Sequence, residues 1–359
     1  MTLARGGAPP HAGALIRDLL PRLVRGERLT REEASRAVHA MVGGGEEPAV
    51  IGAFLAALAA RGESESELLG GAEALRAEAV PFAPGLSPLL DTCGTGGDGS
   101  GSFNVSTAVA FVAAAAGVPV AKHGNRSVSS RCGSADLLEE AGAVIDLGPD
   151  ACGAILRETN FCFLYARRFH PAVGRVAPVR QALGIRTLFN WLGPLANPAR
   201  ATHQLLGVSD RDRVEPVARV LQGLGTRRAL VVHGRGGLDE LALDGENLAV
   251  LVEADTAPRA VAIDAQALGL KPAPLEALGG GDATTNASIL RHLFSGERGA
   301  IRDAVVLNAA AALWVAERVA DLEEGASLAA RTLDDGSAGR TLGLFIAATR
   351  RHAAGGASA

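Results

Sequence analysis

A glycine-rich stretch between a predicted strand and a predicted helix carries the most informative chemistry of this chain. Residues 91–107 read DTCGTGGDGSGSFNVST, with five glycines among the eight residues 94–101. Glycine permits positive φ angles and lets backbone N–H groups approach an anion closely. Asn104, Ser106 and Thr107 stand where the helix should begin, and a helix N-terminus adds free N–H donors and a positive dipole end. The pattern predicts a cradle for phosphate or pyrophosphate rather than a flexible turn with an N-cap.

The same stretch contains a GxGxxG pattern at Gly94, Gly96 and Gly99, which by itself suggests a dinucleotide site. A Rossmann unit needs an acidic residue near the end of its second strand to hold the ribose hydroxyls. Here the next apolar run leads into a basic, serine-rich loop, KHGNRSVSSRCGS, at 122–134. Lys122 can neutralise a phosphate as a compact cation while serine hydroxyls donate to its oxygens. We therefore expect a second phosphate-binding loop, with a solvated charged loop as the alternative.

Two adjacent carboxylates, Asp239 and Glu240, follow the apolar run ALVVH. Neighbouring carboxylates are often surface residues. They also suit Mg²⁺, which proteins hold through carboxylates and waters beside a phosphate-bearing substrate. Arg180 could make a bidentate contact with a substrate carboxylate, which a lysine would not reproduce. For the nearby Arg186 we favour a structural role between a helix and a loop.

The elements that must position these residues differ between the two parts of the chain. Residues 14–80 show helical patterns only, and apolar residues recur at helical spacing from Ile16, although Pro21 should kink or restart that helix. Further helix signals are two capping boxes, a proline suited to a first turn and a glycine suited to a helix end: Thr30 with Glu33, Ser64 with Glu67, Pro48, and Gly62. We expect a small bundle of four short helices.

Beyond residue 81 short apolar runs alternate with helical patterns, which indicates parallel strands joined by right-handed helical crossovers. From 241 to 263 three apolar runs lack intervening helices, which suggests a short antiparallel addition, and helices dominate again from 283 to 354. The expected strands of the alternating part are LLDTC, VPVAK, AVIDL, FCFLYA, HQLLGV and RALVVHG; those of the addition are LAL, LAVLVE and RAVAID.

Composition narrows the classes of function. The chain has 359 residues, 48% of them apolar, and a net charge of −4, so it has no basic surplus to hold a nucleic acid. The first residues lack the apolar core of a secretory signal, and the longest charge-free run, 104–121, contains Asn, Ser, Thr, Gly and Pro that a lipid-facing helix would avoid. The four cysteines show no CxxC pairing. We expect a cytoplasmic protein with reduced cysteines that binds neither membranes nor nucleic acid.

Five segments occur in a specific order over nearly the whole chain: GTGGDGSGSFNVST, KHGNRSVSSRCGSADLLE, PVRQALGIRTLFNWLGPLANP, VVHGRGGLDEL and GGDATTNASIL. Together they resemble the anthranilate phosphoribosyltransferase family. The resemblance implies an α/β protein with a small helical N-terminal domain, in a nucleoside phosphorylase/phosphoribosyltransferase-like fold with a mostly parallel central sheet. It implies a helical domain in 1–80, joined by helices from about 172–198, and an α/β phosphoribosyl-binding domain in 81–171 and 199–359. A homodimer built through the helical part is also implied.

The implied activity is that of a glycosyltransferase, more narrowly a pentosyltransferase. It would transfer the phosphoribosyl group of phosphoribosyl pyrophosphate (PRPP) to the amine of anthranilate, giving N-(5-phosphoribosyl)anthranilate and pyrophosphate in tryptophan biosynthesis. Mg²⁺, two ions per subunit, would assist. The resemblance implies that Lys122, Asp239 and Glu240 carry catalysis, that Ser106, Asp239 and Glu240 contact Mg²⁺, and that Gly94, Asn125 and Arg180 contact anthranilate. The residues implied to bind PRPP are Gly94, Gly97, Asp98, Ser102, Asn104, Val105, Ser106, Thr107, Lys122, His123, Gly124, Asn125, Arg126, Ser127, Val128, Ser129, Ser130 and Ser134.

One segment departs from the family pattern. Just before PVR, members usually read something like AMRHVxPVR, whereas this chain reads AVGRVAPVR, with Val173, Gly174 and Arg175 in place of Met, Arg and His. The segment lies near the aromatic substrate in the family, so we expect altered affinity for anthranilate. Two other functions stay open: a pyrimidine nucleoside phosphorylase-like enzyme, which the KHGNR loop disfavours, and a non-enzymatic nucleic-acid-binding relative, which the acidic net charge and the LDE segment disfavour.

Overall fold

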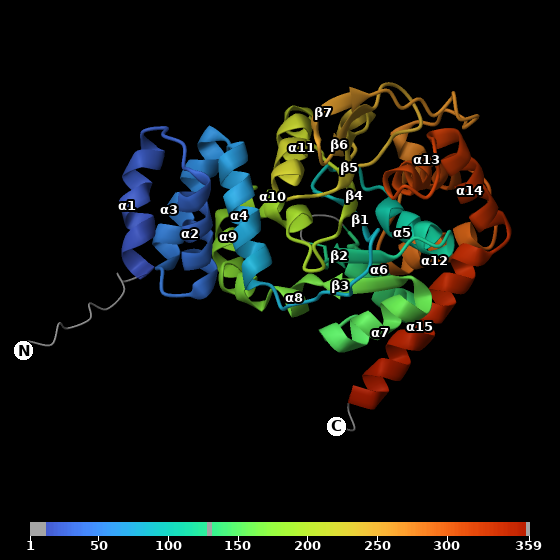
Figure 1. Cartoon of the computed structure of the whole chain (residues 1–359), viewed down its shortest axis with the longest axis horizontal. Coiled ribbons are helices and arrows are strands. Elements are labelled where there is room, and N and C mark those ends of the chain that lie inside the picture. The colour runs from blue at the N-terminus through green and yellow to red at the C-terminus, as the bar shows by residue number, and fades with distance from the viewer. Residues whose placement is uncertain (1–11, 128–130, 357–359) are drawn as a thin grey trace, which may run out of the picture. The chain divides into compact units, whose positions relative to one another are not determined.

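The computed structural model describes residues 12–127 and 131–356, which fold into two compact units (Figure 1). One unit holds the described residues up to Glu78 together with Ala172–Leu192. The other holds the described residues of Ala79–Pro171 and those from Gly193 onward.

The helical unit contains the predicted bundle. Both capping boxes are confirmed, since Thr30 Oγ1 accepts from Glu33 N at 3.2 Å and Glu67 Oε2 accepts from Ser64 N at 2.7 Å. The first helix continues through Pro21, so the predicted restart is not observed there; the proline stands in the last turn, so only the three residues after it could be displaced by a kink. The helices are α1 (Ala12–Val24), α2 (Arg31–Gly43), α3 (Pro48–Arg61), α4 (Glu65–Glu78), α9 (Ala177–Leu183) and α10 (Leu188–Leu195), the last of which ends beyond the boundary of this unit.

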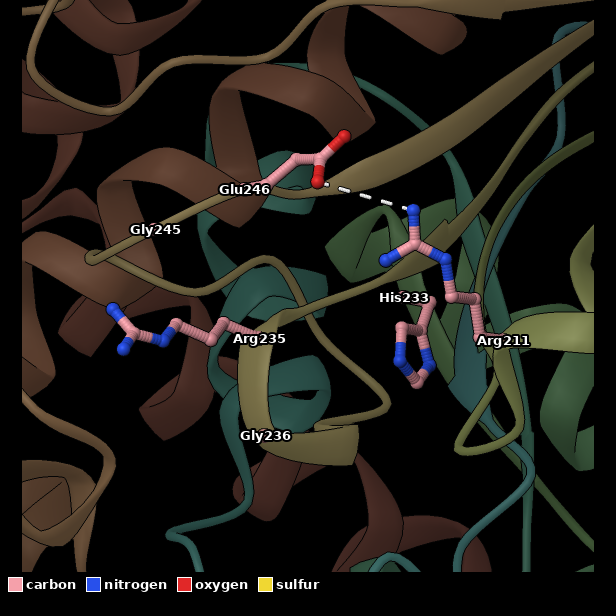
Figure 2. A pocket seen from close by; sticks show the side chains of 6 residues that line it. All are labelled: Arg211, His233, Arg235, Gly236, Gly245 and Glu246. Atoms are coloured by element: carbon pink, nitrogen blue, oxygen red, sulfur yellow. Dashed lines mark ion pairs between the residues drawn. The ribbon is translucent and has the colours of Figure 1, made fainter.

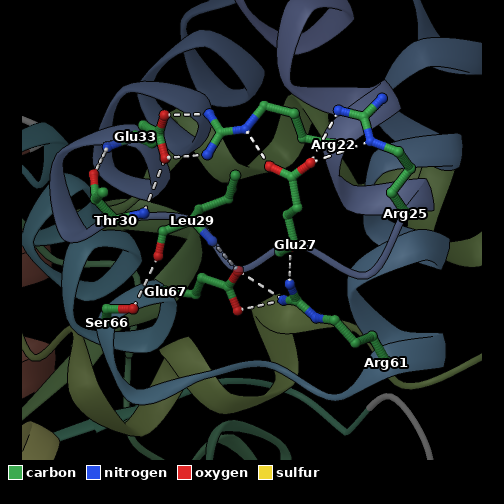
Figure 3. Close-up of polar contacts among 9 residues, drawn as sticks. All are labelled: Arg22, Arg25, Glu27, Leu29, Thr30, Glu33, Arg61, Ser66 and Glu67. Carbon is green, nitrogen blue, oxygen red and sulfur yellow. Dashed lines mark hydrogen bonds and ion pairs between the residues drawn. The ribbon is translucent and has the colours of Figure 1, made fainter.

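A buried carboxylate ties the bundle together (Figure 3). Glu67 is fully buried and accepts hydrogen bonds from Arg61 Nη2 at 2.5 Å and from Leu29 N at 2.8 Å. Although burial raises the pKa of Glu67, the hydrogen bonds from Arg61, Leu29 and Ser64 hold it below its usual value. A buried charge is tolerated only when paired and hydrogen-bonded in this way, so the pair fixes the α1–α2 loop against α3 and α4.

The α/β unit is built on one sheet with strand order β3-β2-β1-β4-β5-β6-β7. Its first five strands pair in parallel, while β6 and β7 are antiparallel, which confirms the mostly parallel sheet and the antiparallel addition. The strands are β1 (Leu90–Gly94), β2 (Val120–Gly124), β3 (Phe161–Tyr165), β4 (His203–Gly207), β5 (Arg228–His233), β6 (Leu248–Glu253) and β7 (Thr256–Val261).

Two predicted strands are wrong. Residues 143–147 and 241–243 form no strand, although Ile145, Leu147, Leu241 and Leu243 are buried. Both segments are irregular runs whose apolar side chains fill the core. A short apolar run records burial, and burial alone does not distinguish a strand from a buried loop.

Helices pack on the sheet, and α5 is buried almost throughout (Figure 1). Phe111 of α5 lies with its ring centroid 4.3 Å from that of Phe161 in β3 and 5.7 Å from that of Phe345 in α15. These contacts fix the direction of α5 and therefore the position of the glycine-rich loop before it. The helices of this unit are α5 (Val105–Ala115), α6 (Ser134–Ala141), α7 (Pro149–Thr159), α8 (Ala166–Phe169), α11 (Val214–Gly223), α12 (Ala283–Phe294), α13 (Ala300–Val315), α14 (Leu322–Asp334) and α15 (Ser337–Gly356).

The topology itself marks a place for a ligand. Strand β1 has β2 on one side and β4 on the other, so the chain order reverses at β1. In open parallel sheets, ligands bind outside the carboxyl ends of the strands at such a switch point. Among the helices that the structure describes, none combines the length and hydrophobicity needed to span a bilayer.

Candidate active site

The predicted site residues of the α/β unit lie at the carboxyl ends of neighbouring strands. The glycine-rich loop leaves β1 at Gly94, the basic loop leaves β2 at Gly124, and Asp239 and Glu240 follow β5. Gly94 is paired in register with Gly207 at the end of β4. The switch point of the sheet is therefore where the predicted phosphate-binding groups meet.

Two glycines make room for Asp239. A Cβ atom on Gly207 would lie 1.6 Å from the backbone oxygen of Asp239, and a Cβ on Gly94 would lie 2.2 Å from its Oδ2 atom. Any side chain at either position would displace the loop that carries the acid. Asp239 Oδ2 accepts a hydrogen bond from Gly96 N at 2.7 Å, which joins the loop after β5 to the glycine-rich loop. Gly207 was not among the predicted site residues.

Three carboxylates share this end of the sheet with one lysine. Burial first, and then the charge of Asp98, raise the pKa of Asp239 to about 7. Burial and the charge of Asp239 raise the pKa of Glu240 to about 8, although Lys122 lowers it in part. Glu240 Oε1 accepts from Ser106 N at 2.9 Å. An accumulation of mutually repelling acids is typical of a site that binds a cation or a proton.

Lys122 is buried in β2, with 2% of its surface exposed. Its ammonium donates to the carbonyl of Thr92 and, at 3.2 Å, to Ser106 Oγ. Asp91, fully buried, balances part of its charge, and burial raises the pKa of Asp91 to about 6 although Lys122 lowers it. Asp91 Oδ2 accepts from Asn197 Nδ2 at 2.8 Å. Neither Asp91 nor Asn197 was predicted as a site residue; the signal for Asp91 was a carboxylate inside the apolar run LLDTC.

The prediction of free N–H donors at the start of α5 is wrong in this structure. The N–H of Val105 bonds Phe103 O at 2.7 Å, that of Ser106 bonds Glu240, and that of Thr107 bonds Asn104 O at 3.1 Å. The carboxylate of Glu240 thus occupies the helix terminus where a phosphate was expected. Gly96, Gly97 and Gly99 of the glycine-rich loop are exposed and have φ angles of 66°, 70° and 71°, but the N–H of Gly96 already donates to Asp239 Oδ2.

The other predicted residues of the glycine-rich loop differ in their contacts. Asp98 Oδ1 accepts from Ser100 N at 3.2 Å, and Ser102 Oγ accepts from Ser100 Oγ at 3.0 Å. Val105 and Thr107 are buried in α5. Asp98 Oδ2 and Thr107 Oγ1 are buried polar atoms that have no hydrogen-bond partner within the described part of the chain. Buried polar atoms are normally hydrogen-bonded, so these two oxygens are candidates to contact a bound group.

The basic loop is held largely by the carboxylate of Asp136, in the helix α6 that follows it. Asp136 Oδ2 accepts from Ser127 N at 3.0 Å and from Gly133 N at 2.9 Å, and Asp136 Oδ1 accepts from Arg126 Nη1 at 3.1 Å. Arg126 also pairs with Glu139 at 2.5 Å, so its guanidinium is committed to the α6 side of the loop. Val128, Ser129 and Ser130 lie outside the described residues.

The other residues of this loop are placed by backbone contacts. Asn125 is exposed, and its carbonyl accepts from Ser134 Oγ at 3.5 Å. A Cβ on Gly124 would lie 2.3 Å from Ser134 Oγ, so the close approach requires glycine. His123 is buried against His170, with ring centroids 5.1 Å apart, and burial lowers its pKa to about 3. His123 is therefore neutral at physiological pH and holds no proton to donate as an imidazolium.

The arginines of the helical unit contact neighbouring side chains and backbone. Arg180 Nη2 donates to Asn190 Oδ1 at 3.5 Å and lies over the ring of Phe189, 5.6 Å from its centroid; burial lowers the pKa of Arg180. Arg186 lies over the ring of Trp191 at 4.9 Å, in keeping with a structural role. Arg175, from the segment that departs from the family pattern, donates to Val42 O at 2.5 Å, at the end of α2.

A separate pocket of about 380 Å³ opens near the end of β5, lined by Arg211, His233, Arg235, Gly236, Gly245 and Glu246 (Figure 2). It contains none of the predicted site residues. Its arginines are already paired, Arg211 with Glu246 at 3.8 Å and Arg235 with Asp244 at 3.6 Å.

The carboxylates fit a Mg²⁺ ion that brings ligands of its own. In the part of the chain that the structure describes, no group of three or more His, Cys, Asp or Glu side chains is arranged to hold a metal unaided. Mg²⁺ in phosphate-transferring sites is usually bound by one or two carboxylates, waters and substrate phosphates. The raised pKa values of Asp239 and Glu240 and the unpartnered oxygen of Asp98 suit that donor set.

Comparisons with known proteins agree with this geometry. The chain matches the α/β domain of the glycosyl transferase family over residues 86–339 and the helical bundle domain of the same family over residues 17–79. It is 52% identical to the anthranilate phosphoribosyltransferase of Roseiflexus castenholzii, over 90% of this chain and 95% of the relative. The crystal structure of anthranilate phosphoribosyltransferase from Thermus thermophilus is 46% identical, with a TM-score of 0.87 over 93% of this chain and 99% of that one. The enzyme from Saccharomyces cerevisiae in complex with PRPP and Mg is 25% identical, with a TM-score of 0.86 over 95% of this chain and 100% of that one. The chain belongs to the anthranilate phosphoribosyltransferase family.

Proposed function

We propose that this protein is an anthranilate phosphoribosyltransferase of tryptophan biosynthesis, transferring the phosphoribosyl group of PRPP to the amine of anthranilate with release of pyrophosphate. The observation that carries the proposal is the meeting of the glycine-rich loop, Lys122, Asp239 and Glu240 at the switch point of the sheet. A diphosphate with a bound cation satisfies all of these groups at once, because it supplies negative charge to the amides and the ammonium and positive charge to the acids.

The roles of the residues follow from their environments. The exposed glycine-rich loop at Gly96, Gly97 and Gly99 is proposed to bind diphosphate oxygens, and a change of partner of Asp239 from Gly96 N to the cation would release that amide. Lys122 is proposed to neutralise charge that develops as pyrophosphate leaves. The reaction is a displacement at the anomeric carbon of ribose, so catalysis depends on positioning and on charge stabilisation. Each well-placed contact of this kind contributes roughly 10²–10³ in rate. Because His123 is neutral, we assign it no role as a general acid.

Asp239 and Glu240, with Ser106, would hold Mg²⁺, and two ions per subunit are proposed. When bound, it neutralises diphosphate charge and so makes pyrophosphate a better leaving group. Glu240 now caps α5 through Ser106 N, and a change of its partner from the amide to the cation would free that amide for a phosphate oxygen. Asp98 lies close enough to raise the pKa of Asp239 and is proposed to orient waters of the cation.

Anthranilate is proposed to bind through Gly94, Asn125 and Arg180. In the helical unit, Arg180 sits against an aromatic ring with a long contact of 3.5 Å to Asn190. A guanidinium in this setting suits a planar carboxylate. Cytoplasmic location and a homodimer assembled through the helical part are proposed from the resemblance, as is the lack of a nucleic-acid partner.

The proposal is tested by following the loss of anthranilate fluorescence after adding PRPP, with and without Mg²⁺. We expect loss that depends on both PRPP and Mg²⁺, and release of one pyrophosphate per anthranilate consumed. No loss with folded protein would refute the proposal. Phosphorolysis of uridine or thymidine would instead support the nucleoside phosphorylase alternative, and salt-sensitive retention on DNA without turnover would support the nucleic-acid-binding one.

A further inference from the structure

The segment GGDATTNASIL, residues 280–290, belongs to the family pattern but contains none of the residues proposed to act in the reaction. In the structure it forms the turn before α12 and the first part of that helix. Asp282 caps the helix by accepting from Thr285 N at 2.8 Å. A Cβ on Gly280 would lie 2.7 Å from Asn286 Oδ1 and 2.9 Å from Phe103 Cα, so this turn is packed directly on the glycine-rich loop.

Backbone hydrogen bonds join this turn to the end of the glycine-rich loop. Phe103 N donates to Leu278 O at 2.9 Å, and Gly280 N donates to Gly101 O at 2.9 Å. Ser102 and Gly279 form an isolated antiparallel bridge. The loop proposed to hold the diphosphate is thus fixed along residues 101–103 by a segment from a distant part of the chain.

Two side-chain amides extend the connection to the basic loop. Asn286, with 1% of its surface exposed, accepts from Gly281 N at 2.8 Å and donates through Nδ2 to Asn104 Oδ1 at 2.8 Å. Asn104 in turn donates through its own Nδ2 to Cys132 O at 3.1 Å. Because Gly281 N fixes which end of the Asn286 amide donates, the orientation of the Asn104 amide is fixed as well.

From this relay we infer that Asn286 is a positioning residue for PRPP: it orients Asn104 so that the glycine-rich loop and the basic loop are held at the spacing that one diphosphate requires. The inference rests on the proposed function and names a residue without substrate contact. Loops held in the bound arrangement lose less conformational entropy on binding, so the relay lowers the cost of binding PRPP. Its loss should raise the KM for PRPP more than it lowers kcat.

The test is Asn286→Asp, which keeps the size of the side chain and the acceptor for Gly281 N but replaces the donor by an acceptor. Asn104 must then turn its amide toward the new carboxylate, which points its oxygen at Cys132 O and breaks that bond. We expect the KM for PRPP to rise roughly ten-fold or more, because the loss of one buried hydrogen bond has about this effect on an equilibrium constant. The change in kcat should be smaller. Asn286→Ala, which removes the donor without adding charge, should shift the KM in the same direction and serves if the first variant does not fold.

The matched control is Asn247→Asp. Asn247 is also buried and donates to a backbone carbonyl, Ala242 O, at 3.0 Å, but it touches neither phosphate loop. A residue of purely structural importance would lower the melting temperature and leave the KM for PRPP unchanged, which is the result expected for this control. Titration calorimetry with PRPP and Mg²⁺ separates the two proposals. If the unmodified protein does not bind PRPP, the proposed function fails; if it binds and both Asn286 variants bind equally well, the positioning role is overturned.

Discussion

Replacing Asp239 by Asn should make the metal-free protein more stable at pH 8 while abolishing most of its activity. The pKa of Asp239 is raised from its ordinary value of 3.8 to about 7, so the folded state prefers the protonated acid. The contribution of Asp239 to the free energy of unfolding is therefore fully present below about pH 4 and is lost as the pH rises through 7. A difference of about 3 pKa units corresponds to roughly 4 kcal/mol at most, and sharing of the shift with Glu240 reduces what one substitution recovers, so we expect about 1–4 kcal/mol.

Asparagine resembles the protonated acid at every pH and can still accept from Gly96 N, so the variant should not lose that contact. Thermal unfolding without Mg²⁺ should show a melting temperature higher than that of the unmodified protein at pH 8, by roughly 2–4 °C per kcal/mol, and a smaller difference at pH 5. Turnover of anthranilate should fall roughly 10²-fold or more. Asp244→Asn, which removes a carboxylate paired with Arg235 at 3.6 Å outside the site, should change neither quantity by much. Lower stability of the Asp239 variant at pH 8, or retained turnover, would refute this reasoning.

Contacts of Lys122, Gly94 and Arg61 each lead to a further prediction. Lys122→Met should lower kcat/KM roughly 10²-fold or more, because a buried ammonium that donates to Ser106 Oγ is lost; steady-state kinetics at saturating Mg²⁺ would measure this, and a change below about three-fold would contradict the assigned role. Gly94→Ala should reduce activity far more than Gly343→Ala in α15, since a Cβ would lie 2.2 Å from Asp239 Oδ2 in the first case and meet nothing within 4 Å in the second; equal activities would show that Asp239 need not sit where it does. Arg61→Ala should destabilise the helical unit by about 3–5 kcal/mol because it leaves the fully buried Glu67 unpaired, as chemical denaturation would report; an unchanged midpoint would contradict the importance of this pair.

The meeting of the predicted site segments was largely predictable because parallel strands end at one edge of a sheet. Once 91–107, 122–134 and 239–240 each follow an apolar run, the topology brings them together, and the structure has Asp239 on Gly96 N and Glu240 on Ser106 N. The local helix signals were equally informative, since both capping boxes depend on residues three apart.

What the sequence did not reveal depends on partners far apart in the chain. Asn286 and Asn104 are 182 residues apart, and Asp91 and Asn197 are 106 apart, so no local pattern relates them. The free amides expected at α5 were not predictable for this reason, because the competing acceptor, Glu240, comes from a distant loop. Arg126 is a different case: its partners Asp136 and Glu139 stand close by in the sequence, but the sequence pattern does not show that they, and not a phosphate, take its charge.

The central claim, that one diphosphate and its cation are held where the carboxyl ends of β1, β2 and β5 converge, is tested most directly by a crystal structure of this protein grown with PRPP and Mg²⁺. We predict density for the diphosphate against the amides of Gly96–Gly99 and the ammonium of Lys122, with the cation beside Asp239 and Glu240. A diphosphate bound elsewhere, with these side chains in their present contacts, would contradict the account.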